Sequence, residues 1–150
     1  MAEHAQASVP EFGGRTPGKV YVPRPGAYGL IFDDSGRIAV METPRGCFLP
    51  GGGSEDSETP EETLLREVQE ECGFRITVGR RLGEAAEYRD TPGHEFAIRK
   101  DCVFFAATVT GTGGAATEPD HTLLWLKPDE AETRLAHGSQ QWAVRQSCQS

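Results

Sequence analysis

The segment 59–73 constrains the fold of this 150-residue chain more than any other. Thr59, Pro60 and Glu62 are typical of a helix N-cap, first position and third position, and Gly73 is typical of a helix C-terminus. A helix between them, at about 100° per residue, gathers four side chains on one apolar stripe, namely Leu64, Leu65, Val68 and Cys72. We therefore expect an amphipathic helix that packs on a sheet.

The same helix carries an acidic face beside its apolar stripe. Glu67, Glu70 and Glu71 stand at positions i, i+3 and i+4, so their carboxylates project close together and repel one another. A hard divalent cation relieves this repulsion, and Mg²⁺ prefers oxygen ligands of this kind. The glycines at 51–53 have no side chains that would keep a phosphate or a cation away from this face. The pattern predicts a site for a cation and a phosphate.

Strand patterns surround the helix. A hairpin is expected from strands at 27–32 and 37–41 joined by a turn at 33–36. Further strands are expected at 76–88, 101–110 and 122–126, a polar loop at 89–100, and short helices from 128 and at 139–146. These elements predict one α/β domain over 20–146, with a flexible arm at 1–19 and a tail at 147–150.

Composition excludes several classes of function. The net charge of −8 argues against a protein that binds the phosphate backbone of nucleic acids. No apolar stretch approaches the roughly 20 residues of a membrane-spanning helix, and the N-terminus does not resemble a signal peptide, so a cytoplasmic location is expected. The four cysteines form no C-x-x-C pair, which favours free thiols over a zinc site.

The spacing across 52–74 carries a family resemblance. The string Gly52-x5-Glu58-x7-Arg66-Glu67-Val68-x-Glu70-Glu71-x-Gly73-Phe74 matches the Nudix box, G-x5-E-x7-R-E-U-x-E-E-x-G-U with U a bulky apolar residue, at every specified position. The chain therefore resembles the Nudix hydrolases, and the likeness extends over most of 25–146.

This resemblance implies an α/β/α sandwich with a mixed β-sheet, and a pyrophosphohydrolase that uses Mg²⁺, with Mn²⁺ as an alternative. It implies that Glu67, Glu70 and Glu71 bind the cation together with the Gly51 carbonyl, and that Arg66 and Glu58 orient the carboxylates. From spacing alone, Arg66 can pair with Glu62 or Glu70 or reach back to Glu58. Family members often supply one more acid from outside the box. Glu118 is the first candidate for it, with Asp120 and Glu95 as alternatives.

The expected substrate is a small nucleotide-like molecule such as a dNTP, an oxidised nucleotide or a nucleotide sugar. Besides Gly52 and Gly53, several residues could contact a base or phosphates, namely Arg24, Tyr28, Arg99, Tyr88 and Phe96. His94 and His121 are interpreted as bystanders. The loop at 89–100 is the best candidate for a basic lid, through Arg89, His94, Arg99 and Lys100.

Two other functions stay open. One is a catalytically weak nucleotide sensor, with a homodimer as an option, although an intact trio of glutamates argues against a pure sensor. The other is a different cation-dependent reaction, such as isomerisation of an isoprenyl diphosphate, which no paired Cys and Glu placement favours.

Overall fold

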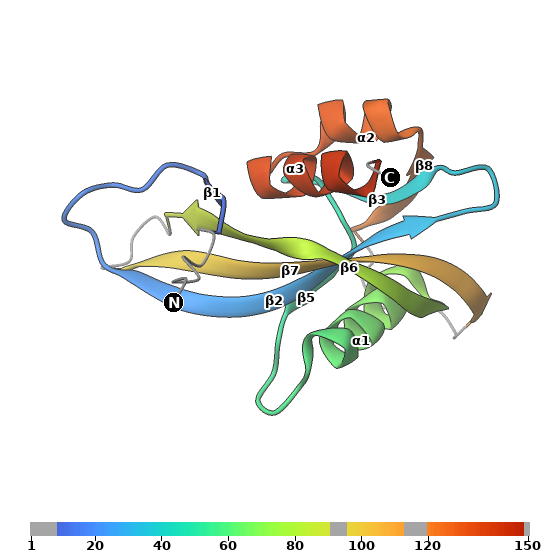
Figure 1. The fold of residues 1–150 in the computed structure, drawn as a ribbon, viewed down its shortest axis with the longest axis horizontal. Coiled ribbons are helices and arrows are strands. Elements are labelled where there is room, and N and C mark those ends of the chain that lie inside the picture. The colour runs from blue at the N-terminus through green and yellow to red at the C-terminus, as the bar shows by residue number, and fades with distance from the viewer. Residues whose placement is uncertain (1–8, 91–95, 113–119, 149–150) are drawn as a thin grey trace, which may run out of the picture.

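The computed structural model describes residues 9–90, 96–112 and 120–148. Within them, five strands precede the first of three helices, three more strands follow it, and two helices end the chain order (Figure 1). The elements are β1 (Glu11–Phe12), β2 (Tyr21–Phe32), β3 (Ile38–Thr43), β4 (Gly46–Phe48), β5 (Gly51–Gly53), α1 (Pro60–Cys72), β6 (Phe74–Arg89), β7 (Ala97–Thr112), β8 (Thr122–Leu126), α2 (Pro128–Arg134) and α3 (Gly138–Ser147).

The strands form one mixed sheet with helices on both faces. Its order is β1-β6-β7-β2-β3-β4, with β5 paired to β2 and β8 paired to β3. β2 runs parallel to β7, whereas β6 is antiparallel to β7. Helix α1 covers one face, and α2 and α3 cover the other (Figure 1). The expected α/β/α sandwich with a mixed sheet is confirmed.

Two apolar clusters hold the three layers together. Leu64 and Val68 of α1 pack with Ile31 and Phe105 on one face of the sheet. On the other face, Leu30 and Phe104 pack against Val144 and neighbouring residues of α2 and α3. Alternate residues of β2 and β7 thus enter opposite clusters, as the pleat of a sheet buried on both faces requires.

Helix α1 begins and ends where the sequence predicts. The Thr59 side chain accepts the backbone N–H of Glu62, the Glu62 carboxylate accepts the N–H of Thr59, and Gly73 takes a left-handed conformation at φ 73°. The apolar stripe differs from the prediction at one position, because Leu65 is 44% exposed. Thr63 faces inward instead. Its buried hydroxyl donates to the Thr59 carbonyl and bonds to Ser54 and Glu58 in the loop before the helix.

The predicted hairpin forms between β2 and β3, where Phe32 pairs with Ile38. Asp33 closes its turn by accepting the backbone N–H groups of Ser35 and Arg37 on one carboxylate oxygen. Gly36 has a φ of 78°, a conformation that favours glycine.

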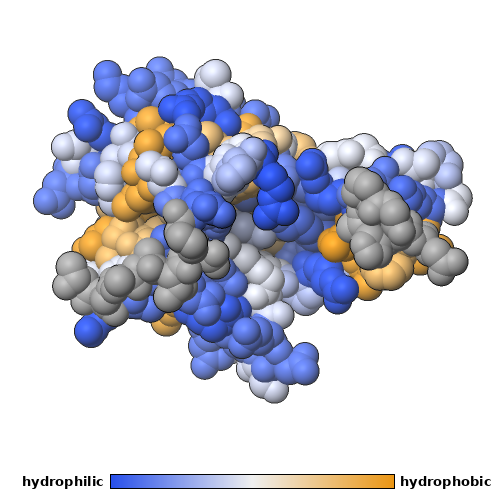
Figure 2. Space-filling model, turned by 180° about the vertical axis from the view of Figure 1, so that it is seen from behind, coloured by the Kyte–Doolittle hydropathy of each residue, from blue (hydrophilic) through white to orange (hydrophobic). Residues whose placement is uncertain are grey.

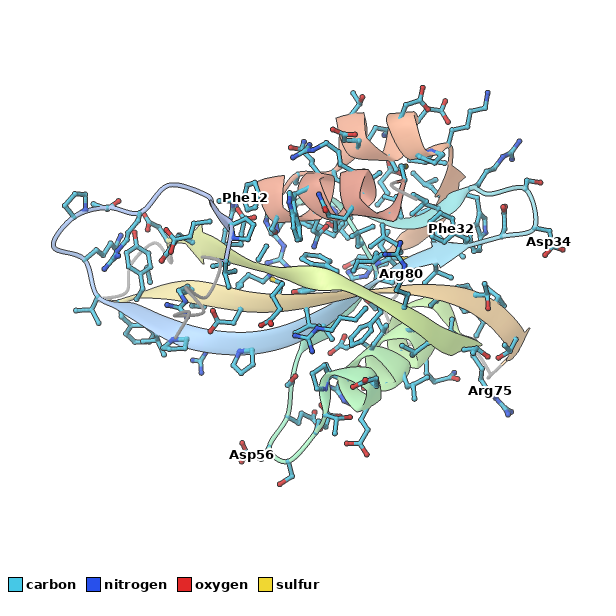
Figure 3. All side chains as sticks on the ribbon, viewed as in Figure 1. Phe12, Phe32, Asp34, Asp56, Arg75 and Arg80 are labelled. Atoms are coloured by element: carbon cyan, nitrogen blue, oxygen red, sulfur yellow. The ribbon has the colours of Figure 1, made fainter. Side chains whose placement is uncertain are left out.

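The N-terminal boundary lies earlier than the sequence predicts. The sequence predicts a flexible arm over 1–19 outside the core. In the described part of this segment, however, Glu11–Phe12 forms β1 and pairs in parallel with β6. The Phe12 ring lies 6.5 Å from the ring of Trp142 in α3 (Figure 3). A stretch rich in Gly and Pro gives little sign of such a short strand, since the backbone pairing with β6 and the contact of Phe12 with α3 both depend on distant residues. At the other end, α3 continues to Ser147, one residue into the expected tail.

The surface seen from behind is mainly hydrophilic, with apolar side chains showing in smaller areas (Figure 2). No helix among the described residues combines the length and the apolar character needed to cross a membrane. All four cysteines fall in the described part of the chain and carry free thiols, as expected.

Candidate active site

Strand β5 brings glycine backbone against the acidic face of α1. Gly51–Gly53 pairs with Gly26–Tyr28 of the central strand β2, although the sequence predicts only a Gly-rich entry to the helix here. A Cβ on Gly52 would lie 2.6 Å from the carboxylate carbon of Glu67, so no larger residue fits without displacing this carboxylate. The glycines therefore allow the carboxylates of α1 to approach the edge of the sheet.

Arg66 joins the acidic residues that the sequence singles out. Its Nε and Nη2 donate to the two oxygens of Glu58 at 2.7 and 3.1 Å, and Nη2 also donates to the Gly53 carbonyl at 3.0 Å. Nη1 donates to Glu67 at 3.0 Å and to Glu70 at 3.2 Å. The hydrogen bonds from Arg66 are the main reason why the pKa of Glu58 is lowered to about 2, and they raise the pKa of Arg66 in turn. Glu62, the other predicted partner, caps the helix instead.

Glu71 points away from this network and toward the sheet. Its carboxylate accepts the Gly51 backbone N–H at 2.8 Å, and its other oxygen lies 3.7 Å from Nδ1 of His121. His121, interpreted as a bystander from the sequence, is only 22% exposed at its side chain and precedes β8. The pairing of β8 with β3 brings it here, and nothing local in the sequence indicates this contact.

Of the three acidic residues proposed from outside the box, the structure describes only Asp120. Asp120 is exposed beside His121. Glu118 and Glu95 lie outside the described residues, so the prediction of an additional acidic ligand stays a prediction. Among the described side chains, no three from His, Cys, Asp and Glu are already grouped around a common point as metal ligands are. Their oxygens are of the type that a hard cation prefers, but two of the three glutamates in the trio bond to Arg66.

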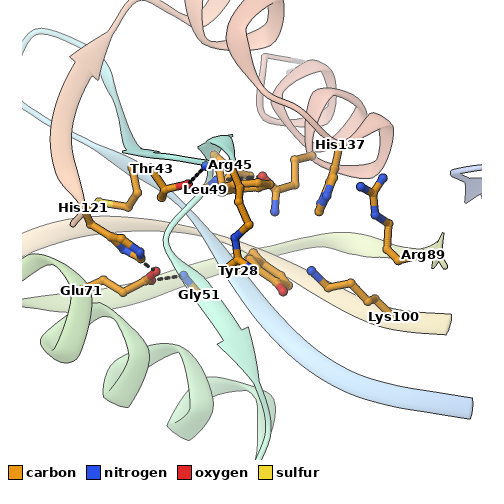
Figure 4. A pocket seen from close by; sticks show the side chains of 13 residues that line it. Tyr28, Thr43, Arg45, Leu49, Gly51, Glu71, Arg89, Lys100, His121 and His137 are labelled. Atoms are coloured by element: carbon orange, nitrogen blue, oxygen red, sulfur yellow. Dashed lines mark hydrogen bonds and ion pairs between the residues drawn. The ribbon is translucent and has the colours of Figure 1, made fainter. Parts of the chain in front are cut away.

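A cavity of about 370 Å³ opens beside Glu71, a volume typical of small-molecule sites (Figure 4). Tyr28 of β2 is 6% exposed in its wall, and burial together with nearby anionic groups raises the pKa of its hydroxyl. The Lys100 ammonium lies 5.1 Å from the centre of the Tyr28 ring. The residues that line the cavity are Tyr28, Met41, Thr43, Arg45, Phe48, Leu49, Gly51, Glu71, Arg89, Lys100, His121, His137 and Gln140.

Only some of the predicted substrate contacts line this cavity. Tyr28 does, whereas Arg24 is exposed near the start of β2, and Arg99 turns away to pair with Asp101 at 2.8 Å. Tyr88 and Phe96 are also absent from the lining. Seven lining residues were not expected from the sequence, and they come from β3, from β4 and the residues on either side of it, and from the start of α3. They are Met41, Thr43, Arg45, Phe48, Leu49, His137 and Gln140.

The described ends of the segment 89–100, which was expected to form a lid-like loop, lie in strands instead. Arg89 is the last residue of β6, and Arg99 and Lys100 lie in β7, so these side chains have fixed strand positions. The polar composition of the segment suggested a loop, but its described ends belong to paired strands: Arg89 pairs with Ile98, and Tyr88 with Arg99. His94 lies outside the described residues.

Comparison with known proteins supports one family. Residues 22–146 match the NUDIX domain. An 8-oxo-dGTP diphosphatase of Proteus vulgaris is 39% identical over 79 residues, 49% of this chain and 64% of that protein. A CMP-5'-(N-acetyl-N-hydroxy-3-aminopropyl)phosphonate hydrolase of Streptomyces rubellomurinus is 32% identical over 136 residues, 84% of this chain and 63% of that protein.

The chain thus spans less than two thirds of the length of either relative. Among solved structures, a NUDIX hydrolase from Nitrosomonas europaea superposes with a TM-score of 0.66 at 17% identity, over 84% of this chain and 88% of that one, which supports the shared fold. The match over 22–146, the complete box and this fold together place the chain in the NUDIX domain family.

Proposed function

We propose that this chain hydrolyses a phosphoric anhydride in a nucleotide-like substrate with the help of a divalent cation. The observation that carries the proposal is the position of Glu71, which belongs both to the acidic trio of α1 and to the wall of the cavity. A substrate in the cavity would therefore present its phosphates to a face already rich in carboxylates. An acidic face attracts phosphates only when cations lie between them, so the two features favour one cation-dependent reaction.

Mg²⁺ is the proposed cation, with Mn²⁺ as the alternative. Glu67, Glu70 and Glu71 would hold it together with the Gly51 carbonyl. When bound, it would neutralise charge on the phosphoryl oxygens and lower the pKa of a bound water. Arg66 keeps Glu67 and Glu70 beside the glycine strand through its hydrogen bonds, and Glu58 holds the guanidinium in turn. Gly52 leaves room for the Glu67 carboxylate, which a side chain at this position would displace.

The substrate would occupy the cavity with its anhydride at the Glu71 end. The names of the relatives suggest two kinds of substrate, an oxidised nucleoside triphosphate and a nucleotide joined to a phosphonate. Tyr28 and Phe48 offer ring faces or edges to an uncharged part of the molecule. A free nucleotide in the cytoplasm suits a chain of net charge −8 better than a nucleic acid does.

The experiment compares the parent with Glu70→Gln on a substrate panel in the presence of Mg²⁺. The panel contains nucleoside triphosphates, 8-oxo-dGTP, dinucleoside polyphosphates, ADP-ribose, sugar nucleotides and a CMP-linked phosphonate, and products are identified after separation. Because Glu70→Gln removes a proposed cation ligand, we expect turnover to fall about 100-fold or more while the melting temperature is retained.

Glu61→Gln is the matched control, because Glu61 is exposed in the first turn of the same helix. It should retain parental activity. Equal turnover in the parent and in Glu70→Gln would exclude the proposed cation site. Tight cation-dependent binding of a panel member without any turnover would favour the nucleotide sensor.

A further inference from the structure

The two ends of the cavity carry opposite charge. Glu71 lies at one end, where its carboxylate accepts the Gly51 N–H. At the other end, Arg89 and Lys100 extend from adjacent strands, with the buried side chain of His137 above them (Figure 4). Both cations lie in strands and not in the loop expected from the sequence, and no step of the proposed hydrolysis uses them.

Strand register gives the separation of the backbone levels from which these side chains extend. Tyr28 pairs with Gly51, whereas Arg24 pairs with Lys100. Four residues therefore separate the two levels along β2, which corresponds to about 13 Å at the usual rise per residue of a strand. The Lys100 ammonium extends over the Tyr28 ring from its end. Arg89 pairs with Ile98, which pairs with Val22, so its backbone lies farther still along the sheet from the level of Gly51.

The cations at this end have little compensation from the protein. Glu87 is the carboxylate that faces them among the described residues, with Oε2 3.8 Å from Nη1 of Arg89. Its Oε1 accepts the Ser139 N–H at 3.0 Å, at the start of α3. One carboxylate therefore faces two cations. It can neutralise only one of them, so one net positive charge remains at this half-buried end of the cavity.

Burial is the first cause of the pKa shifts at this end of the cavity, and the two cations add to it at His137. The pKa of His137 is lowered to about 4, first by burial and then by the charges of Lys100 and Arg89. Burial is also the main reason why the pKa of Lys100 is lowered. An anion bound here would gain from both cations in surroundings that screen charge less than water does.

We propose that Arg89 and Lys100 bind a second anionic group of the substrate, a carboxylate, phosphate or phosphonate remote from the anhydride. This proposal rests on the proposed function and adds the substrate class: a nucleotide-like anhydride with negative charge at both ends. Tyr28 and Phe48 also line the cavity and would contact the uncharged part of such a substrate. A substrate that is neutral at its far end leaves the cations without their partner.

The test uses pairs of ligands that share a base and an anhydride and differ in one remote anionic group. UDP-glucuronate is compared with UDP-glucose, and ADP-ribose 2′-phosphate with ADP-ribose. Affinities are measured by calorimetry with Ca²⁺ in place of Mg²⁺, and hydrolysis is followed separately with Mg²⁺. In at least one pair we expect the parent to bind the anionic member about tenfold more tightly or better, a difference typical of one charge-assisted contact.

Lys100→Met and Arg89→Met should each reduce this preference toward unity, and Lys100→Arg should retain it. The matched control is Arg80→Met, because Arg80 is exposed on the same strand as Arg89 and does not line the cavity. Its preference should equal that of the parent. Thermal unfolding identifies any variant that has lost the fold. The preference is compared only among the variants that remain folded.

The proposal is overturned if the parent binds both members of each pair alike, or binds none of them. It is also overturned if Lys100→Met and Arg89→Met are folded and keep the full preference. A preference for the anionic member without hydrolysis of any ligand would uphold this site and contradict the proposed reaction. Hydrolysis of a ligand without any preference for the anionic member would uphold the proposed reaction and contradict this site.

Discussion

Arg66 is the residue on which the acidic face of α1 depends. It donates to Glu58, Glu67 and Glu70 and to the Gly53 carbonyl, so one guanidinium connects the helix, the preceding loop and β5. Lysine has a single ammonium and could not satisfy these acceptors in the same plane. The side chain of Arg66 is 24% exposed and that of Glu58 is 18% exposed, so solvent screens this pair less than a pair on the open surface.

The pH dependence of stability tests the pair at Glu58. Its folded-state pKa is about 2 against an ordinary value of 4.5, so the carboxylate stabilises the fold fully above pH 4.5. This contribution is lost as the pH falls from 4.5 toward 2. Glu58→Gln should therefore be less stable than the parent at neutral pH, and the difference should shrink in acid. Urea denaturation of both proteins at a series of pH values measures it, and a difference that stays constant down to the lowest pH would contradict the assignment.

At the scale of the element, helix α1 shows what local sequence can predict. Its caps follow from Thr59, Pro60 and Gly73, because each acts through backbone groups within one helical turn. Its buried face follows only in part, since Leu65 lies at the edge of the apolar arc, where a rotation of a few degrees decides exposure. Thr63 faces inward because its hydroxyl bonds to Ser54 and Glu58 in the preceding loop. The periodicity of apolar residues in a helix does not predict such partners.

Two leucines on α1 provide a matched pair. Leu64 is fully buried between the helix and the sheet, whereas its neighbour Leu65 is 44% exposed. Leu64→Ala should lower the free energy of unfolding by about 2 to 5 kcal/mol, because it leaves a cavity in the core. Leu65→Ala should lower it by less than about 1 kcal/mol. Chemical denaturation of the two variants measures the difference, and equal losses would mean that the helix faces the sheet differently.

At the scale of the molecule, the candidate site combines segments far apart in the chain. The box between Gly52 and Phe74 could be read directly, because its residues share one loop and one helix. The cavity could not, since the order of strands in the sheet assembles its lining from β2 to β7 together with α1 and α3. His121 and Lys100 illustrate this limit: each looks like an isolated polar residue until cross-strand pairing places it beside Glu71 or Tyr28.

Strand β1 contacts both the neighbouring strand β6 and helix α3, so its contribution to the stability of the whole molecule can be tested. The Pro10 carbonyl accepts the Ala86 N–H of β6 at 2.8 Å, and the Phe12 ring contacts α3, where a Cβ on Gly138 would lie 2.8 Å from it. Phe12→Ala should lower the free energy of unfolding by about 1 to 3 kcal/mol, less than for a fully buried phenylalanine, because Phe12 is only partly buried.

The same substitution should speed hydrogen exchange at the Ala86 amide, since β1 would dock less often on the edge of β6. Val9→Ala is the control, because Val9 lies just outside the strand and is 44% exposed. Exchange at Ala86 should stay near the parental rate in that variant. If Phe12→Ala leaves both stability and Ala86 exchange unchanged, the contact with Trp142 does not hold β1 on the sheet, and residues 9–19 behave as the free arm that their composition suggests.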